Sequence, residues 1–225
     1  MIILAVDTAL GACSVALVSD GRVLAHEHRD MARGHAEALA PMVEDLMRRA
    51  GCAFSEVDRI GVTTGPGTFA GQRVGLAFAR ALALALKKPA IGVTTLDVMA
   101  AESLSRSGAP SWAIAAADAK RGEIYLGARD HSVSLLEPEL VLLAEASARL
   151  ASLAKSNGPT VTLAGTAAEA LAPLLLASGF APSDSLIRQP DAIFVARLAA
   201  VAPIGPPPKP LYLRPPDAKL PATSP

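Results

Sequence analysis

One short pattern occurs twice in this chain, each time directly after an apolar run, and it constrains the fold more than any other feature. Ile2–Val6 leads into Asp7-Thr8-Ala9-Leu10-Gly11, and Trp112–Ala117 leads into Asp118-Ala119-Lys120-Arg121-Gly122. A tight turn favours Gly for its permissive backbone, and Asp can accept hydrogen bonds from nearby amides. Because the Asp-x-x-x-Gly pattern opens two halves of similar order, we expect a duplicated domain.

The first half predicts three strands followed by alternating helices and strands. Asp20-Gly21 is a two-residue hairpin signal, and apolar residues recur at helical spacing from His35 to Ala50, with Gly51 as the C-cap. The predicted strands are 2–6, 13–18, 22–28, 59–64 and 90–94, and the predicted helices are 35–50, 71–87 and 96–104.

The second half repeats this order after a linker at Arg106–Pro110. We expect strands at 112–117, 123–128, 132–136 and 161–164, and helices at 144–155, 167–177 and 192–201. The expected segments are an N-terminal lobe with partner-binding helices (1–105), a C-terminal lobe (106–202) and an extended, proline-rich tail (203–225). Two β-β-β-α-β-α lobes are typical of the duplicated actin-like (ASKHA, ribonuclease-H-like) α/β fold.

Composition restricts the classes of function. The chain has 21 basic and 21 acidic residues and no basic stripe, so we expect it to hold RNA only with help from another protein. Its two cysteines form no CxxC pair, which favours a reducing compartment. The N-terminus reads as a strand rather than a signal peptide, and the apolar stretch Val74–Leu86 is too short to span a bilayer. We therefore expect a cytoplasmic protein with no membrane contact.

Several motifs resemble those of the TsaB (YeaZ) family. Gly65-Pro66-Gly67-Thr68-Phe69-Ala70-Gly71-Gln72-Arg73-Val74-Gly75 is similar to the family's GPGSFTGLRIG. Asp118-Ala119-Lys120-Arg121-Gly122-Glu123-Ile124-Tyr125 is similar to its DARRGEVY, and Pro210-Leu211-Tyr212-Leu213-Arg214 matches its P-x-Y-x-R. The matches run in the right order over most of the chain.

The resemblance implies an accessory subunit rather than an enzyme. The catalytic relative TsaD carries H-x-x-x-H on a helix, where two imidazoles bind a metal. Here His35 is present but the second position is Leu39, so we expect no metal, no cofactor and no catalytic residue. The family implies a heterodimer with TsaD, docking of the ATPase TsaE onto the pair, and contact with tRNA only through that complex. A homodimer is expected when the chain is alone.

The remaining candidate residues allow a functional and a structural interpretation. Asp7 and Asp118 could orient magnesium and Gly67 could help cradle a phosphate, or all three could simply hold tight turns. Lys120 and Arg121 stand where nucleotide-binding relatives usually keep Gly and Thr, which disfavours a phosphate pocket. His26 and His28 share one face of a strand and could bind a metal, but no Cys or carboxylate pair lies near them in sequence, so we expect an exposed strand without a metal. Cys13 carries no triad signature and is expected to be a small buried hydrophobe.

The helix predicted at 71–87 has little polar surface, which favours burial or a partner chain. Gly71, Gly75, Ala79 and Ala83 repeat every four residues. With the family resemblance, we predict a partner interface formed by Leu39, Val43, Met47, Gly71, Val74, Gly75, Phe78, Ala79 and Leu82. The alternatives are an actin-like ATPase or kinase that uses Asp7 and Asp118, and a peptidase-like relative.

Overall fold

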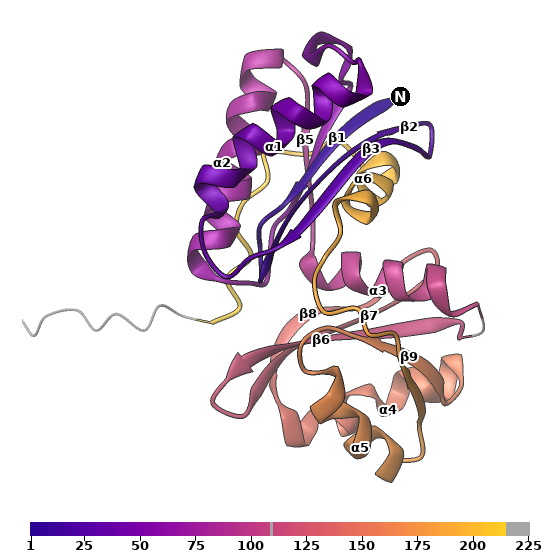
Figure 1. Cartoon of the computed structure of the whole chain (residues 1–225). Coiled ribbons are helices and arrows are strands. Elements are labelled where there is room, and N and C mark those ends of the chain that lie inside the picture. The colour runs from indigo at the N-terminus through magenta and orange to yellow at the C-terminus, as the bar shows by residue number, and fades with distance from the viewer. Residues whose placement is uncertain (109, 215–225) are drawn as a thin grey trace, which may run out of the picture.

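The computed structural model describes residues 1–108 and 110–214, and it contains two five-stranded sheets with the same connectivity (Figure 1). The first sheet has the order β3-β2-β1-β4-β5 and consists of β1 (Ile2–Asp7), β2 (Ala12–Ser19), β3 (Arg22–Asp30), β4 (Arg59–Thr63) and β5 (Ala90–Val93). The second has the order β10-β9-β6-β7-β8 and consists of β6 (Trp112–Lys120), β7 (Glu123–Asp130), β8 (Ser134–Leu142), β9 (Thr160–Ala164) and β10 (Ala181–Asp184).

The two sheets also repeat the direction of their strands. In each, the first three strands form an antiparallel meander, and the last two run parallel to the first strand. The duplicated α/β fold expected from the repeated hairpins is therefore confirmed. Asp7, at the end of β1, and Asp118, near the end of β6, occupy equivalent places in the two sheets.

Two helices each pack on the sheet formed by the other half of the chain. The helices are α1 (His35–Ala50), α2 (Phe69–Leu86), α3 (Thr95–Ser107), α4 (Ala146–Asn157), α5 (Ala168–Ala177) and α6 (Ala192–Val201), with 3-10 turns at Phe54–Glu56 and Leu143–Glu145. α3 packs on β6, β7 and β9, whereas α6 returns to β1, β2 and β4 (Figure 1). The packing units therefore differ from the continuous segments 1–105 and 106–202.

The apolar surface of the first sheet explains why α6 packs on it. Its α1 and α2 face buries Leu4, Val6 and Val15, while the opposite face buries Ile3 and Ala5. A strand buried on both faces needs cover on both sides. α6 covers this opposite face with four buried residues, Ala192, Val195, Ala196 and Ala199.

Most predicted elements are present, and the largest differences lie in the second lobe. β8 begins at Ser134 rather than residue 132, because Asp130 Oδ1 accepts hydrogen bonds from the amides of Ser132 and Val133 and holds them in a turn. β10 was not predicted, since its sequence Ala-Pro-Ser-Asp lacks any strand pattern. α2 begins at Phe69 because Thr68 is its N-cap and accepts a hydrogen bond from the Gly71 amide.

The C-terminal segment, defined here as residues 203–214, has no helix or strand in the structure and returns to the first lobe. The Leu211 amide donates a 2.8 Å hydrogen bond to the carbonyl oxygen of Thr64, at the end of β4. The rest of the predicted tail, residues 215–225, and Ala109 of the predicted linker lie outside the described residues.

Candidate functional site

The glycine-rich loop before α2 is packed directly against the first hairpin. The Thr68 amide donates a 2.8 Å hydrogen bond to the carbonyl oxygen of Ala9. A Cβ atom on Gly67 would lie well under 3.0 Å from that oxygen, and one on Gly71 would lie equally close to the carbonyl oxygen of Thr8. The backbones can approach only because both residues are glycine. This geometry supports the structural interpretation of the loop, a sharp turn with close packing.

Thr8 fastens the same hairpin to α2. Its buried hydroxyl donates a 2.7 Å hydrogen bond to the Gly71 carbonyl and accepts a 3.0 Å bond from the Gly75 amide. The Gly71 amide already bonds to Thr68. Thr8 Oγ1 thus lies between the Gly71 carbonyl and the Gly75 amide of α2 and holds the helix against the end of β1.

Asp7 is buried beneath this loop. Its Oδ1 accepts hydrogen bonds from the Thr63 hydroxyl and the Ala9 amide, and its Oδ2 is buried with no hydrogen-bond partner among the described residues. Burial raises the pKa of Asp7 to about 7, against the lowering effect of the Thr63 hydrogen bond. In this structure the carboxylate is fully buried, and its Oδ1 holds the turn after β1.

Asp118, the equivalent residue of the second lobe, has a different environment. It is 43% exposed and accepts hydrogen bonds from the Lys120 amide at 2.8 Å and from Lys120 Nζ at 2.6 Å. These bonds hold the pKa of Asp118 below its usual value. Lys120 and Arg121 both adopt positive φ values, 66° and 60°, in the hairpin turn. Among the described residues, no hydrogen bond joins Asp7 to Asp118, and each serves its own turn.

The C-terminal segment connects α2 to the second hairpin. Arg73 lies over the ring of Phe69, 3.6 Å from its centroid, and its Nε donates a 2.8 Å hydrogen bond to the hydroxyl of Tyr212. The Tyr212 ring stacks on Phe69 at 5.9 Å. Further on, Arg214 bonds to the carbonyl oxygen of Ala119 and pairs with Glu123. The Tyr and Arg of the P-x-Y-x-R motif thus join the two lobes, a role that the motif alone did not reveal.

The predicted partner interface requires a correction. Six of its residues, Leu39, Val43, Met47, Gly71, Gly75 and Ala79, are buried inside the monomer. The apolar stripe of α1 packs on β2 and β3, and the small-residue face of α2 packs on β4. These residues satisfy the monomer core, because an apolar stripe faces the nearest sheet first. Val74, Phe78 and Leu82 are half-buried at the edge of that core.

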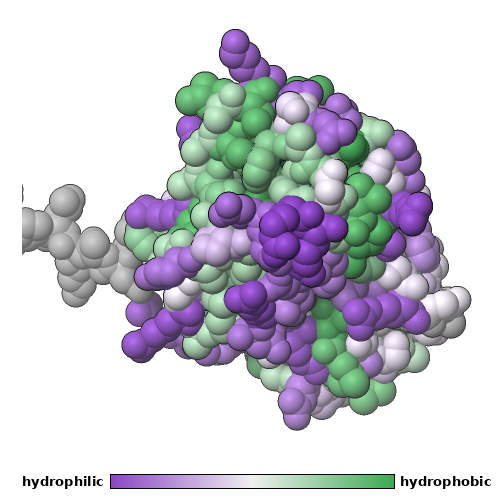
Figure 2. All heavy atoms as spheres, turned by 45° about the horizontal axis from the view of Figure 1, so that its top comes forward, coloured by the Kyte–Doolittle hydropathy of each residue, from purple (hydrophilic) through white to green (hydrophobic). Residues whose placement is uncertain are grey.

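A different face of α2 is exposed and apolar. Its exposed members are Ala70, Ala77, Ala81, Leu84 and Ala85, and Leu84 is 81% exposed. Figure 2 shows green apolar side chains gathered at the upper left, the side on which α2 lies in Figure 1, beside purple hydrophilic ones. Among the described residues α2 is also the one helix long and apolar enough to cross a membrane, but its glycine face is packed on β4.

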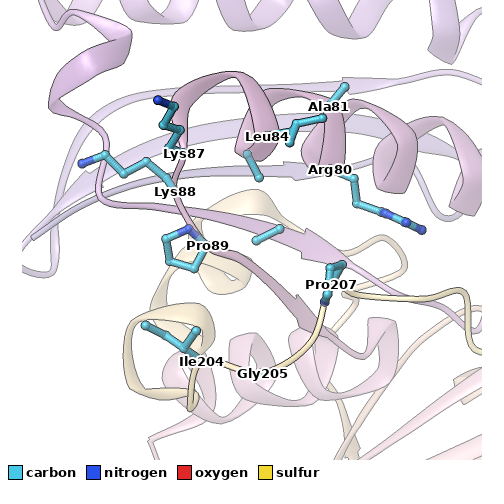
Figure 3. A pocket seen from close by; sticks show the side chains of 11 residues that line it. Arg80, Ala81, Leu84, Lys87, Lys88, Pro89, Ile204, Gly205 and Pro207 are labelled. Atoms are coloured by element: carbon cyan, nitrogen blue, oxygen red, sulfur yellow. The ribbon is translucent and has the colours of Figure 1, made fainter.

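A hollow of about 620 Å³ lies between the end of α2 and the C-terminal segment (Figure 3). Arg80, Lys87 and Lys88 extend from the side of α2, and Ile204 and Pro207 lie opposite. Lys88 Nζ also lies 4.0 Å from a carboxylate oxygen of Asp58. The exposed apolar face of α2 therefore ends at a cationic, partly apolar hollow.

His26 and His28 differ from the expectation of an exposed strand. Both are half-buried and lie beside Asp191, which begins α6 in the second part of the chain. The sequence held no signal for this, since Asp191 is remote from β3 along the chain. Cys13 is buried, as expected, and burial raises the pKa of its thiol to about 11.

Comparison with known proteins places these features in context. Residues 27–201 match the sequence model of a family described as TsaD, tRNA N6-adenosine threonylcarbamoyltransferase. Over 125 residues the chain is 42% identical to the tRNA threonylcarbamoyladenosine biosynthesis protein TsaB of Escherichia coli strain K12, covering 56% of this chain and 53% of that protein. The chain spans about half the length of the curated TsaB relatives it matches.

Solved structures agree with this match over nearly the whole chain. YeaZ from Pseudomonas aeruginosa is 29% identical with a TM-score of 0.75, covering 94% of this chain and 99% of that one. The ROK hexokinase of Thermus thermophilus shares the fold alone, with 17% identity, a TM-score of 0.54, and coverage of 89% and 99%. The fold and its paired hairpins thus define a two-lobed α/β protein of the actin-like class. Within that class the chain belongs to the TsaB (YeaZ) family, which is related to TsaD.

Proposed function

We propose that this chain is a non-catalytic scaffold subunit in the biosynthesis of threonylcarbamoyladenosine on tRNA, and that it forms a heterodimer with a TsaD-type threonylcarbamoyltransferase. The names of its relatives supply the pathway and the class of partner. In this proposal the partner carries the chemistry, and this chain stabilises it.

The exposed apolar face of α2 is the observation that carries the proposal. Ala70, Ala77, Ala81 and Ala85 have short side chains, so the backbone of a partner helix can approach closely. Leu84 and the half-buried Val74 and Phe78 supply larger apolar contacts on the same helix. An apolar face of this kind, bordered by charge, is typical of a protein interface. The interface therefore lies on the outer face of α2, not on the buried residues predicted from sequence.

The environments of the two repeated aspartates support an accessory role. Asp7 is buried under the glycine-rich loop, and Asp118 is engaged by Lys120. Leu39, which takes the second position of the H-x-x-x-H pattern, is part of the core against β2. Asp7 Oδ1, Asp118 and Leu39 thus each contact residues of the fold, which supports an accessory role.

The proposal extends to the other components named from the family. The ATPase TsaE docks onto the assembled pair, and tRNA is held by the complex rather than by this chain alone. The equal numbers of basic and acidic residues support weak binding of tRNA to the isolated protein. Without its partner, the same face of α2 forms a homodimer. The site of action is then the cytoplasm, where tRNA is modified.

The test uses a charge placed on the exposed face. Ala81→Glu should leave circular dichroism unchanged but abolish co-purification with the TsaD-type partner, because a carboxylate in a packed interface loses its hydration. Ala151→Glu, at an exposed position of α4, is the matched control. The reconstituted tRNA modification assay should fail with the first variant, as it should when this chain is omitted. A folded Ala81→Glu protein that pairs normally would show that the interface lies elsewhere.

An actin-like ATPase or kinase is the alternative, favoured by the shared fold of the hexokinase. Calorimetric titration of the isolated protein with magnesium-ATP separates the two functions. A kinase should bind at micromolar to millimolar concentration and lose binding in Asp7→Asn. The scaffold proposal expects no heat of binding in that range.

A further inference from the structure

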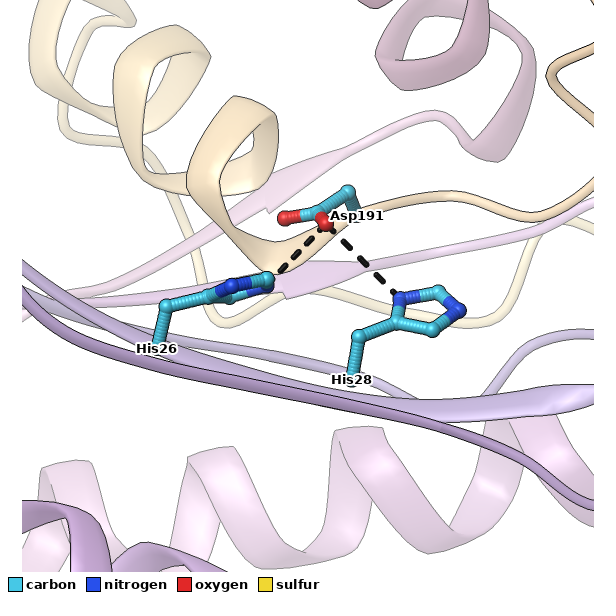
Figure 4. A group of neighbouring side chains, drawn as sticks. All are labelled: His26, His28 and Asp191. Carbon is cyan, nitrogen blue, oxygen red and sulfur yellow. Dashed lines mark ion pairs between the residues drawn. The ribbon is translucent and has the colours of Figure 1, made fainter.

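A cluster of metal-binding side chains lies on the face of the first sheet that α6 covers. A β-bulge at Leu24 sets the alternation of β3, so that Ala25 and Glu27 face α1, where Glu27 pairs with Arg49. His26 and His28 therefore project to the opposite face. There both imidazoles point toward Asp191, the first residue before α6 (Figure 4).

The two carboxylate oxygens of Asp191 make different contacts. Oδ1 accepts a 2.8 Å hydrogen bond from the Ile193 amide and caps α6. Oδ2 lies 3.0 Å from Nε2 of His26 and 3.7 Å from Nδ1 of His28. The cap orients the carboxylate, so that its second oxygen is held between the two imidazoles.

The spacing of these three atoms is that of a coordination shell. Tetrahedral zinc with ligands at about 2.0–2.2 Å separates neighbouring ligand atoms by about 3.3–3.6 Å. The two distances from Asp191 bracket that range, and one atom from each residue lies within 4.8 Å of the others. Nε2 of His26 and Nδ1 of His28 are both buried, and each has Asp191 Oδ2 as its ion-pair partner. A buried polar atom needs such a partner, and a metal ion between the three atoms would bind all of them at once.

A further carboxylate, that of Asp30, and a cavity lie next to these three residues. Nε2 of His28 lies 3.6 Å from Asp30 Oδ1, the arrangement in which a carboxylate orients a metal-bound imidazole. A cavity of about 380 Å³ is lined by His28 and Asp191 and also by Glu102 of α3. Glu102 pairs with Arg106 through Oε1, while its Oε2 is buried without a hydrogen-bond partner among the described residues.

We propose that His26, His28 and Asp191 form a binding site for a divalent first-row transition metal, with Zn²⁺ as the expected ion. Two imidazoles and one carboxylate favour such a metal over magnesium or calcium, which prefer oxygen ligands. The fourth position faces the cavity, where Glu102 or a water molecule completes the shell. With Glu102 as the fourth ligand, the metal would also join β3 of the first sheet to α3, which packs on the second sheet. This site is separate from the position of Leu39 on α1.

The test titrates chelator-treated full-length protein with zinc chloride in competition with a chromophoric chelator. We expect one zinc per chain, and a cobalt-loaded sample should show the visible absorption of a four-coordinate site. His26→Gln and His28→Gln should each weaken zinc binding by about 100-fold or more, and Asp30→Asn by about tenfold. His131→Gln, at an exposed histidine in the turn after β7, is the matched control and should bind as the unmodified chain does.

Thermal unfolding provides an independent readout, since a ligand that binds only the folded state raises the midpoint. Zinc should raise the midpoint of the unmodified protein and of His131→Gln, but not that of the double variant His26→Gln/His28→Gln. Circular dichroism without metal establishes that the double variant is folded. The proposal is overturned if zinc does not bind at one per chain, or if the folded double variant keeps the same affinity. In either case the cluster is an ion pair alone.

Discussion

Arg214 Nη1 donates a 2.7 Å hydrogen bond to the carbonyl oxygen of Ala119, which lies at the β-bulge near the end of β6 in the second hairpin. Arg214 follows α6, which packs on the first sheet, after a run without helix or strand, so this bond returns the chain to the second lobe. A few residues earlier, Tyr212 contacts Phe69 and Arg73 of α2. The C-terminal segment therefore spans from the glycine-rich loop to the repeated hairpin.

Arg214→Ala should lower thermal stability without changing secondary structure. It removes a charge-assisted pair with Glu123 and leaves the Ala119 carbonyl without that donor. The loss should be about 1–3 kcal/mol, which lowers the unfolding midpoint by several degrees in a chain of this size. Arg22→Ala, at an exposed position at the start of β3, is the control. Equal midpoints for the two variants would mean that the segment is not held by this residue.

Gly71→Ala should be destabilising, although alanine is normally the better helix former. The added Cβ would overlap with the Thr8 carbonyl oxygen and the Thr68 hydroxyl, so β1 and α2 would have to separate. We expect a loss of about 1–3 kcal/mol by chemical denaturation. Gly205→Ala has open space around its Cβ and should be near neutral. A stabilised Gly71→Ala protein would contradict the close packing described for this loop.

Ala79→Glu and Ala81→Glu place the same side chain two residues apart on α2, with opposite expected results. Ala79 is fully buried against the first sheet, and an unpaired buried charge costs several kcal/mol, so this variant should be unfolded or insoluble. Ala81 is exposed, so its variant should fold. Far-ultraviolet circular dichroism and size-exclusion chromatography distinguish the two. A folded, monomeric Ala79→Glu protein would contradict the assignment of that face to the core.

Asp7→Asn should reduce the pH dependence of stability. The pKa of Asp7 is about 7 when folded and near 3.8 when exposed, so between these values the folded state retains a proton that the unfolded state has released. The free energy of unfolding must therefore fall as pH rises from about 4 to 7, by on the order of a few kcal/mol from this group. Unfolding midpoints measured across that range should decline less in Asp7→Asn than in the unmodified chain.

Two comparisons make this measurement specific. Glu102, whose pKa burial also raises to about 7, contributes in the same direction and should keep part of the decline in the variant. Glu44→Gln, at an exposed position of α1, should leave the whole profile unchanged. If Asp7→Asn and Glu44→Gln give the same profile, Asp7 does not titrate in this range.

The sequence alone determined the duplication, because each hairpin is a local structure with its own turn residues and strand alternation. The bounds of α1 follow from a local signal of the same kind, an apolar stripe ended by Gly51. The periodicity of apolar residues did not determine which element packs against the apolar face of a helix. From sequence, the apolar face of α1 and the small-residue face of α2 could each be core or interface. The structure decides for the core, because both faces pack on the first sheet.

The tertiary structure also decided every relationship between residues that lie far apart along the chain. α3 and α6 exchange sheets because each sheet exposes an apolar face that its own segment does not cover. Tyr212 meets Phe69, and Asp191 meets His26, only after that exchange brings the second half of the chain back to the first. Periodicity in a sequence records which side of an element is apolar, whereas the neighbour on that side is set by how all the elements together bury their apolar surface.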